Sequence, residues 1–120
     1  AVGDKVLSDL ASVLRQGIRT TDVLARYGGD EFALLMPETD LERARMVLER
    51  LRSFAYSVVT DTGMPVTISC GVAEWSGEAA DSGTEVLRRA DEALYSAKRA
   101  GRNCVRTPEK RLAEPEIPTV

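Results

Sequence analysis

The chain has 120 residues, of which 29% are charged, a formal net charge of −3 and no histidine. This length suits one domain with a modest core, and the charge balance gives no general affinity for nucleic acid. The absence of histidine excludes Ser-His and His-based acid–base chemistry and leaves carboxylates, lysines and arginines for catalysis. No apolar run is long enough to cross a membrane, and no signal-peptide pattern occurs.

The first half of the chain predicts a helix, a hairpin and a second helix. Apolar residues recur at helical spacing from about Asp4 to Ile18. Residues 23–25 and 32–36 are expected to pair as a β-hairpin around Gly28-Gly29, because tight hairpin turns need positive φ. Thr39-x-x-Glu42 predicts a capping box at the start of the second helix.

The second half predicts a buried strand, a third helix and a closing strand. Residues 66–73 are apolar and rich in β-formers, as in a central strand. Ser82-x-x-Glu85 begins the third helix, and Gly101 ends it at the C′ position. A short strand is expected at residues 103–106.

This order of elements predicts an α/β fold with a mixed central sheet flanked by helices. Residues 1–106 are expected to form the domain, and residues 107–120, rich in charge and proline, a flexible tail. Such units usually begin with a strand, so we expect one upstream of Ala1. Cys70 and Cys104 match no metal-binding spacing and are expected to be two buried free thiols of a cytosolic protein, with a disulfide as the less favoured alternative.

The turn of the predicted hairpin carries the strongest chemical signal. Asp30 and Glu31 directly follow Gly28 and Gly29, whose backbone lets a ligand approach closely. Adjacent carboxylates repel each other unless a cation shares them, which favours an Mg²⁺ or Mn²⁺ site holding a polyphosphate. A charged and solvated turn without a ligand would explain the same residues.

Four blocks of the sequence resemble the GGDEF domain, the diguanylate cyclase domain of bacterial signalling. In chain order the blocks are Gly3-Asp4-x-Val6-Leu7, Arg26-Tyr27-Gly28-Gly29-Asp30-Glu31-Phe32, Val66-Thr67-Ile68-Ser69-Cys70-Gly71-Val72-Ala73 and Ala90-Asp91-x-Ala93-Leu94-Tyr95-x-Ala97-Lys98-x-x-Gly101-Arg102-Asn103. They occur in the family's order within residues 3–106. The resemblance implies a nucleotidyl-cyclase-like fold that here lacks its first strand.

The resemblance also implies a signal-transducing transferase that condenses two GTP molecules into cyclic di-GMP with release of pyrophosphate. Each subunit of a homodimer would hold one GTP. Asp30 would bind metal and take part in deprotonating the attacking 3′-hydroxyl, and Glu31 would support metal binding. Gly28 and Gly29 would let the nucleotide lie against the turn. Mg²⁺ or Mn²⁺ would neutralise the triphosphate.

Three further residues match nucleotide-binding positions of the family. The match implies that Asp4 reads guanine and that Lys98 and Arg102 contact the triphosphate. Outside the family pattern, all three are explained as charged residues at helix ends, where the helix dipole stabilises a negative charge at the N-terminus and a positive charge at the C-terminus.

Arg19-Thr20-Thr21-Asp22 has the spacing of the family's inhibitory product site, and Arg50 falls where the family's second arginine lies. The resemblance implies that Arg19, Asp22 and Arg50 bind cyclic di-GMP. A local ion pair between Arg19 and Asp22 is the plainer alternative.

The family's first strand, with a metal-binding aspartate, and the loop after it, with a guanine-reading asparagine, have no counterpart in these 120 residues. We therefore expect little cyclase activity from them alone, and self-association through an exposed sheet edge. Two other functions stay open: a cyclic di-GMP receptor, and a GTP-binding regulator of a neighbouring phosphodiesterase domain. The resemblance also implies an upstream sensor or receiver domain and a cytoplasmic location, in a parent protein that can be membrane-anchored.

Overall fold

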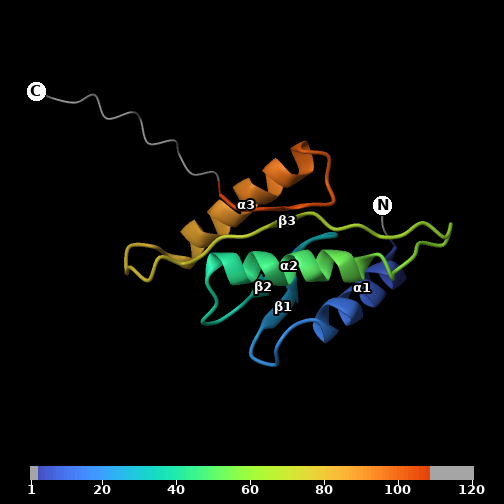
Figure 1. Cartoon of the computed structure of the whole chain (residues 1–120), viewed down its shortest axis with the longest axis horizontal. Coiled ribbons are helices and arrows are strands. Elements are labelled where there is room, and N and C mark those ends of the chain that lie inside the picture. Colours follow the sequence, from blue (N-terminus) through green and yellow to red (C-terminus); the bar gives the residue numbers. More distant parts are fainter. Residues whose placement is uncertain (1–2, 109–120) are drawn as a thin grey trace, which may run out of the picture.

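The computed structural model describes residues 3–108 of the chain. Its elements are α1 (Asp4–Gln16), β1 (Val23–Arg26), β2 (Phe32–Leu35), α2 (Leu41–Ala55), β3 (Cys70–Gly71), α3 (Gly83–Arg99) and β4 (Val105–Arg106). In Figure 1, α2 (green) crosses the front of the molecule, with α3 (orange) above it and α1 (blue) below. The predicted tail lies outside the described residues from residue 109 onward.

The strands form two small sheets, and within residues 3–108 the two are not hydrogen-bonded to each other. Strands β1 and β2 pair in antiparallel fashion, with Val23 opposite Leu35. Strands β3 and β4 are parallel, with Cys70 opposite Val105. The predicted α/β fold with both strand orientations is confirmed, although the strands form two sheets instead of one. Regular pairing covers only Cys70–Gly71 of the predicted strand at 66–73, because β4 is its one strand partner in the described backbone.

The main core lies between α1 and α2, and it follows from the apolar spacing of both helices. Buried side chains recur every three or four residues along α1, so they occupy one face. The cluster of buried residues at the centre of this core consists of Leu10, Leu14, Leu51, Ala55, Val58 and Val66. The hairpin packs against this cluster through Leu24, Phe32 and Leu34. The position of the hairpin therefore depends on the α1–α2 pair.

Helix α3 lies unusually close to β3 at Gly71. A Cβ built on Gly71 would overlap the carbonyl oxygen of Ala90 and the backbone nitrogen of Leu94, and would lie 2.8 Å from the Cα of Leu94. These are backbone atoms of a helix, which cannot move aside as a flexible side chain can. Gly71 is therefore required by a close approach of two backbones.

The start of α2 differs from the prediction. The carboxylate of Asp40, not the hydroxyl of Thr39, accepts the N-cap hydrogen bond from Arg43 N–H at 2.8 Å. The Thr39 hydroxyl is engaged elsewhere, because it donates to the Pro37 carbonyl and accepts from Arg19. At α3 the predicted cap is confirmed: Ser82 accepts from Glu85 N–H.

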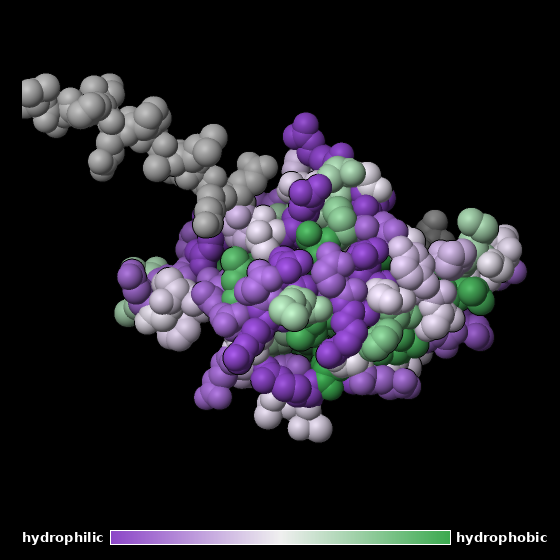
Figure 2. All heavy atoms as spheres, viewed as in Figure 1, coloured by the Kyte–Doolittle hydropathy of each residue, from purple (hydrophilic) through white to green (hydrophobic). Residues whose placement is uncertain are grey.

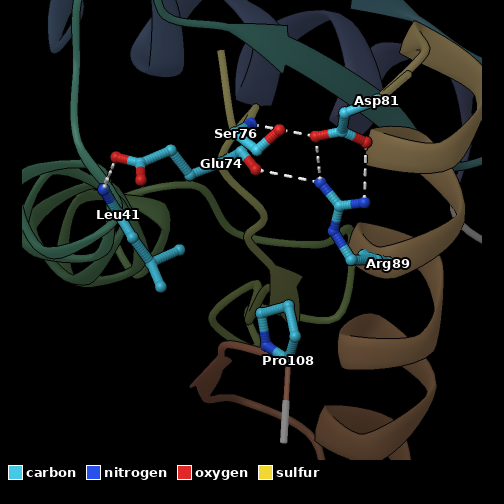
Figure 3. A pocket seen from close by; sticks show the side chains of 6 residues that line it. All are labelled: Leu41, Glu74, Ser76, Asp81, Arg89 and Pro108. Carbon is cyan, nitrogen blue, oxygen red and sulfur yellow. Dashed lines mark hydrogen bonds and ion pairs between the residues drawn. The ribbon is translucent and has the colours of Figure 1, made fainter. Parts of the chain in front are cut away.

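The loop before α3 is held by a cluster around Asp81, shown in Figure 3. Arg89 forms a two-pronged ion pair with the Asp81 carboxylate at 2.9 and 2.8 Å, and it also donates to the Glu74 carbonyl at 3.0 Å. The Glu74 carboxylate accepts from Leu41 N–H, at the first turn of α2. This cluster lines a cavity of about 440 Å³, but its charged groups already have partners within the protein. We infer that the cluster has a structural role, in which it joins the loop to α2 and α3.

Both cysteines are free thiols, as predicted, but each is half-buried and not fully buried as expected. Burial raises the pKa of the Cys70 thiol to about 12, so this residue stays protonated at neutral pH. A protonated thiol is a poor nucleophile and a poor metal ligand. Cys70 therefore acts as a small packing residue.

The outer surface is mostly polar. On the face shown in Figure 2, hydrophilic residues predominate and hydrophobic ones emerge in small groups between them. Scattered exposure of this kind is ordinary for globular domains. None of the helices in residues 3–108 combines the length and the apolar character needed to span a bilayer.

We predict that Gly71→Ala destabilises the protein by about 2–3 kcal/mol, because the added methyl group forces α3 away from β3. Gly83→Ala is the matched control, since a Cβ at that helix position meets open space. Urea unfolding followed by circular dichroism measures both variants. Equal stability of the two variants would contradict the close packing described here.

A second prediction concerns pH. Hydrogen bonds from the Arg89 guanidinium and the Ser76 N–H hold the pKa of Asp81 well below its usual range. The ionised Asp81 carboxylate therefore stabilises the folded protein at neutral pH, and this contribution to the free energy of unfolding is lost as the pH falls below about 3.9, the ordinary aspartate pKa. Asp81→Asn is expected to lower the melting temperature at pH 7, and the gap to wild type is expected to narrow below pH 4.

The exposed Asp61, which has no ion pair within residues 3–108, provides the control variant Asp61→Asn. Melting curves between pH 7 and pH 2.5 test the pair. A gap for Asp81→Asn that stays constant over this range would show that its charge does not stabilise the fold.

Candidate functional site

The hairpin between β1 and β2 closes in a turn that carries the two predicted catalytic carboxylates. Tyr27 N–H donates to the Glu31 carbonyl at 2.7 Å, and Glu31 N–H donates to the Gly28 carbonyl at 3.3 Å. Gly28 has a φ of +67°, as the predicted turn requires, while Gly29 does not use the left-handed region. No atom would obstruct a Cβ on either glycine, so the turn is open on its outer side.

Arg26 fixes the turn, a role that the sequence did not indicate. Its guanidinium donates twice to the Gly29 carbonyl, at 2.9 and 2.7 Å. The same group lies 3.9 Å from the carboxylate of Asp4, which is 96% exposed at the start of α1. The predicted guanine-reading residue therefore lies beside Arg26, at the side of the turn.

Helix α3 reaches the turn from the other side. Lys98 Nζ lies 3.4 Å from the Glu31 carboxylate, across 67 positions of sequence. Both side chains are about one-third to two-fifths exposed, at 36% and 42%, so a ligand can reach them. Asp30 lies exposed on the turn, and Arg102 lies exposed just past the end of α3. The turn thus lies next to the start of α1 through Arg26 and Asp4 and next to α3 through Glu31 and Lys98, whereas no hydrogen bond or ion pair within residues 3–108 joins Arg102 to it.

The backbone after α3 is strained, and a polar network holds it. Gly101, Arg102 and Asn103 have φ values of 108°, 66° and 49°. For a residue other than glycine the left-handed region costs roughly 1–2 kcal/mol. Asn103 offsets this cost: its Nδ2 donates to the Tyr56 hydroxyl at 2.6 Å, and its Oδ1 accepts from Arg52 at 3.1 Å.

Asn103 N–H also donates to Ser69 Oγ at 3.0 Å. Asn103 therefore anchors the turn that carries Arg102 to both α2 and the segment before β3. The sequence block containing Gly101-Arg102-Asn103 gave this residue no function, because its partners lie 34 to 51 positions away.

The turn offers a partial donor set for a divalent cation. Asp30 and Glu31 supply carboxylate oxygens, the ligand type that Mg²⁺ and Mn²⁺ prefer. In the described part of the chain, no three His, Cys, Asp or Glu residues gather to form a complete metal site. Mg²⁺ commonly uses one or two carboxylates together with substrate phosphates and water, so these two residues fit that mode of binding.

The three residues predicted for product binding line one pocket of about 630 Å³. Arg19 and Asp22 lie in the connection between α1 and β1, and Arg50 lies on α2. The pocket lies between the end of α1, the segment after β2 and the outer face of α2. It is separate in sequence from the turn and α3, and none of its lining residues belongs to that first site.

Arg19 is held firmly in this pocket. Its guanidinium pairs with Asp22 at 3.0 Å and donates to the Pro37 carbonyl and Thr39 hydroxyl at 2.9 and 2.7 Å. Burial would raise the pKa of Asp22, but the hydrogen bonds and charge of Arg19 outweigh it and lower that pKa. The local ion pair expected as an alternative is therefore present, within the pocket that the other prediction requires.

Arg50 donates through Nη2 to the Gly17 carbonyl at 2.6 Å, which joins α2 to the end of α1. Arg43 lines the same pocket, although the sequence did not single it out. Its helical spacing of seven residues from Arg50 was the one signal that could have found it.

Comparison with known proteins identifies the family. Residues 1–104 match the family model described as diguanylate cyclase, GGDEF domain. The chain is 46% identical over 102 residues to diguanylate cyclase DgcP of Pseudomonas aeruginosa, which covers 84% of this chain and 15% of that protein. It is 41% identical over 109 residues to the response regulator PleD of Caulobacter vibrioides, covering 87% of this chain and 24% of that protein.

The fold is similar to that of solved GGDEF domains. The GGDEF domain of DgcB from Caulobacter crescentus, solved in complex with c-di-GMP, superposes with a TM-score of 0.77 at 34% identity. The match covers 89% of this chain and 65% of that one. Diguanylate cyclase SiaD from Pseudomonas aeruginosa, solved with its activator SiaC, gives a TM-score of 0.75 at 36% identity, covering 87% of this chain and 40% of that one.

The chain spans 15% and 24% of the length of the two curated relatives, so it corresponds to one part of each. The match to the family model nevertheless extends over nearly all of it, and the fold agrees. The chain therefore belongs to the GGDEF domain family of diguanylate cyclases.

Proposed function

We propose that the protein acts as a diguanylate cyclase, which joins two GTP molecules into cyclic di-GMP. The observation that carries this proposal is the convergence of Asp4, the glycine turn with Glu31, and Lys98 from α3. Carboxylates at an open glycine turn beside a lysine suit a nucleoside triphosphate with its metal ion. The family membership supports the same reaction.

In this proposal each segment binds a different part of GTP. The Asp4 carboxylate accepts hydrogen bonds from guanine N1–H and the guanine amino group, two adjacent donors that adenine lacks. Lys98 and Arg102 are cations for the triphosphate, which approaches the glycine turn without meeting a Cβ. Arg26 keeps the turn in place through its bonds to the Gly29 carbonyl.

The reaction joins the 3′-oxygen of each GTP to the α-phosphorus of the other, so two P–O bonds form and two pyrophosphates leave. Asp30 would accept the proton of the 3′-hydroxyl, and Glu31 would share the metal ion. When bound, Mg²⁺ or Mn²⁺ supplies charge neutralisation of the triphosphate and a lower pKa for the attacking hydroxyl. Because one domain holds one GTP, two copies of the domain would have to face each other.

The separate pocket supports a regulatory function. Arg19, Asp22 and Arg50 gather around one cavity, and arginines bind phosphate groups well. We propose that cyclic di-GMP binds there and limits its own synthesis. A receptor without cyclase activity would use the same pocket, and turnover of GTP separates the two functions.

GTP is a cytosolic nucleotide, so the domain would work in the cytoplasm, under the control of a sensor or receiver domain in the parent protein.

We predict that Asp30→Asn and Glu31→Gln each lower the rate of cyclic di-GMP synthesis by at least about 100-fold, because each removes a charge from the metal and proton-accepting site. The assay uses the natural-length protein with GTP and saturating Mg²⁺, and chromatography quantifies the product. Asp61→Asn, a change of the same kind on an exposed loop, is expected to keep the wild-type rate. Full activity in either of the first two variants would refute the assigned roles.

We predict that Arg50→Ala weakens cyclic di-GMP binding by at least about 10-fold, the loss expected for a charge-assisted hydrogen bond to phosphate. Isothermal titration calorimetry of the natural-length protein gives the dissociation constant. Arg88→Ala is the control, because Arg88 pairs with Glu85 and Glu92 on α3, outside the pocket. An unchanged affinity in Arg50→Ala would indicate that Arg50 only joins α2 to the end of α1, through its hydrogen bond to the Gly17 carbonyl.

A further inference from the structure

The pocket lined by Arg19, Asp22 and Arg50 is called the product pocket below. Helix α2 contributes a single stripe of side chains to its wall. Arg43, Val47, Arg50 and Phe54 all line the pocket. At 100° per residue these positions fall within an arc of about 60° on the helix. The two arginines are seven residues apart, so their Cα atoms are separated by about 10.5 Å along the helix axis. Val47 and Phe54 complete the stripe.

The arginines of the pocket differ in how far the protein already uses them. The Arg19 guanidinium holds Asp22, Pro37 and Thr39, and within residues 3–108 its Nη1 alone has no partner. Arg50 donates one hydrogen bond, to the Gly17 carbonyl. The side chain of Arg43 makes no hydrogen bond or ion pair with any described residue, and its backbone N–H donates to the Asp40 carboxylate.

An exposed arginine with no partner is unusual on this helix. Arg45 pairs with Glu42 and Arg52 pairs with Glu49, both on the side of α2 away from the stripe. Three arginines and two carboxylates line the pocket, Arg19, Arg43 and Arg50 against Asp22 and Glu38, which leaves a net charge of +1. Arg43 is therefore the part of that positive charge that is free to meet a ligand.

We infer that Arg43 is a further ligand-binding residue of the product pocket, and that it binds a second phosphate of the cyclic dinucleotide. This inference rests on the regulatory function proposed above, since it concerns the same pocket. A cyclic dinucleotide carries two phosphates in a ring flanked by two flat bases. The long side chains of two arginines that line one pocket can converge on the two anionic groups, and the apolar surface of Val47 and Phe54 between and beside them suits a base.

Exposure supports this assignment of the apolar residues. Phe54 is one of the large hydrophobic residues that the fold leaves exposed, at 42%, and it lines the pocket. An aromatic face beside arginines offers both stacking and charge to a nucleotide. Without a ligand, the same exposure is an unfavourable contact with water.

The test compares two arginine-to-alanine variants on one helix. Arg43→Ala removes the guanidinium that faces the pocket, and Arg45→Ala removes one on the opposite side, about 200° away. Both are examined in the natural-length protein by isothermal titration calorimetry with cyclic di-GMP, next to wild type and Arg50→Ala. Melting curves check that each variant is folded.

We expect Arg43→Ala to raise the dissociation constant by about 2-fold to 5-fold, the size expected for one exposed charged contact, and Arg45→Ala to leave it unchanged. An unchanged constant for Arg43→Ala, with a loss in Arg50→Ala, would overturn this inference and leave the pocket's function intact. An equal loss in Arg43→Ala and Arg45→Ala would also overturn it, because a general charge effect would then explain both. Absence of binding in the wild type would refute the proposed regulatory function itself.

Discussion

The close packing of α3 on Gly71 is the contact on which the position of the site depends. A side chain at Gly71 would overlap the backbone of Ala90 and Leu94, so α3 lies as near to β3 as two backbones allow. Lys98 is one helical turn beyond Leu94, and at this depth it reaches Glu31 on the hairpin. A helix raised by one side chain would carry Lys98 away from the turn.

The charges of the site neutralise one another weakly in the absence of a ligand. The contact between Lys98 and Glu31 is partly exposed at 3.4 Å, and such pairs contribute about 0–1 kcal/mol. The approach of Arg26 to Asp4 is longer, at 3.9 Å, and more exposed. Both contacts can therefore be exchanged at low cost for a triphosphate, a guanine base or a metal ion. A rigid scaffold that presents loosely paired charges suits a nucleotide site.

The sequence predicted what depends on local pattern and missed what depends on distant partners. The helices, the hairpin turn at Gly28 and the Ser82 cap follow from spacing and from residues within one turn of each other. The predicted N-cap of α2 was wrong because the Thr39 hydroxyl accepts a hydrogen bond from Arg19, twenty positions away. The use of Asn103, likewise, depends on partners brought near only by folding. The family resemblance supplied the candidate site residues; the structure places Glu31 next to Lys98 and Asp4 next to Arg26, and it places Arg19, Asp22 and Arg50 around one pocket.

The central claim is that the hairpin turn and the end of α3 bind one nucleotide together. Hydrogen–deuterium exchange of the natural-length protein, with and without a non-hydrolysable GTP analogue and Mg²⁺, tests it most directly. Peptides covering residues 27–31 and residues 98–103 are expected to gain protection together, at the same nucleotide concentration. Protection of one segment without the other, or protection confined to the pocket of Arg19 and Arg50, would contradict it.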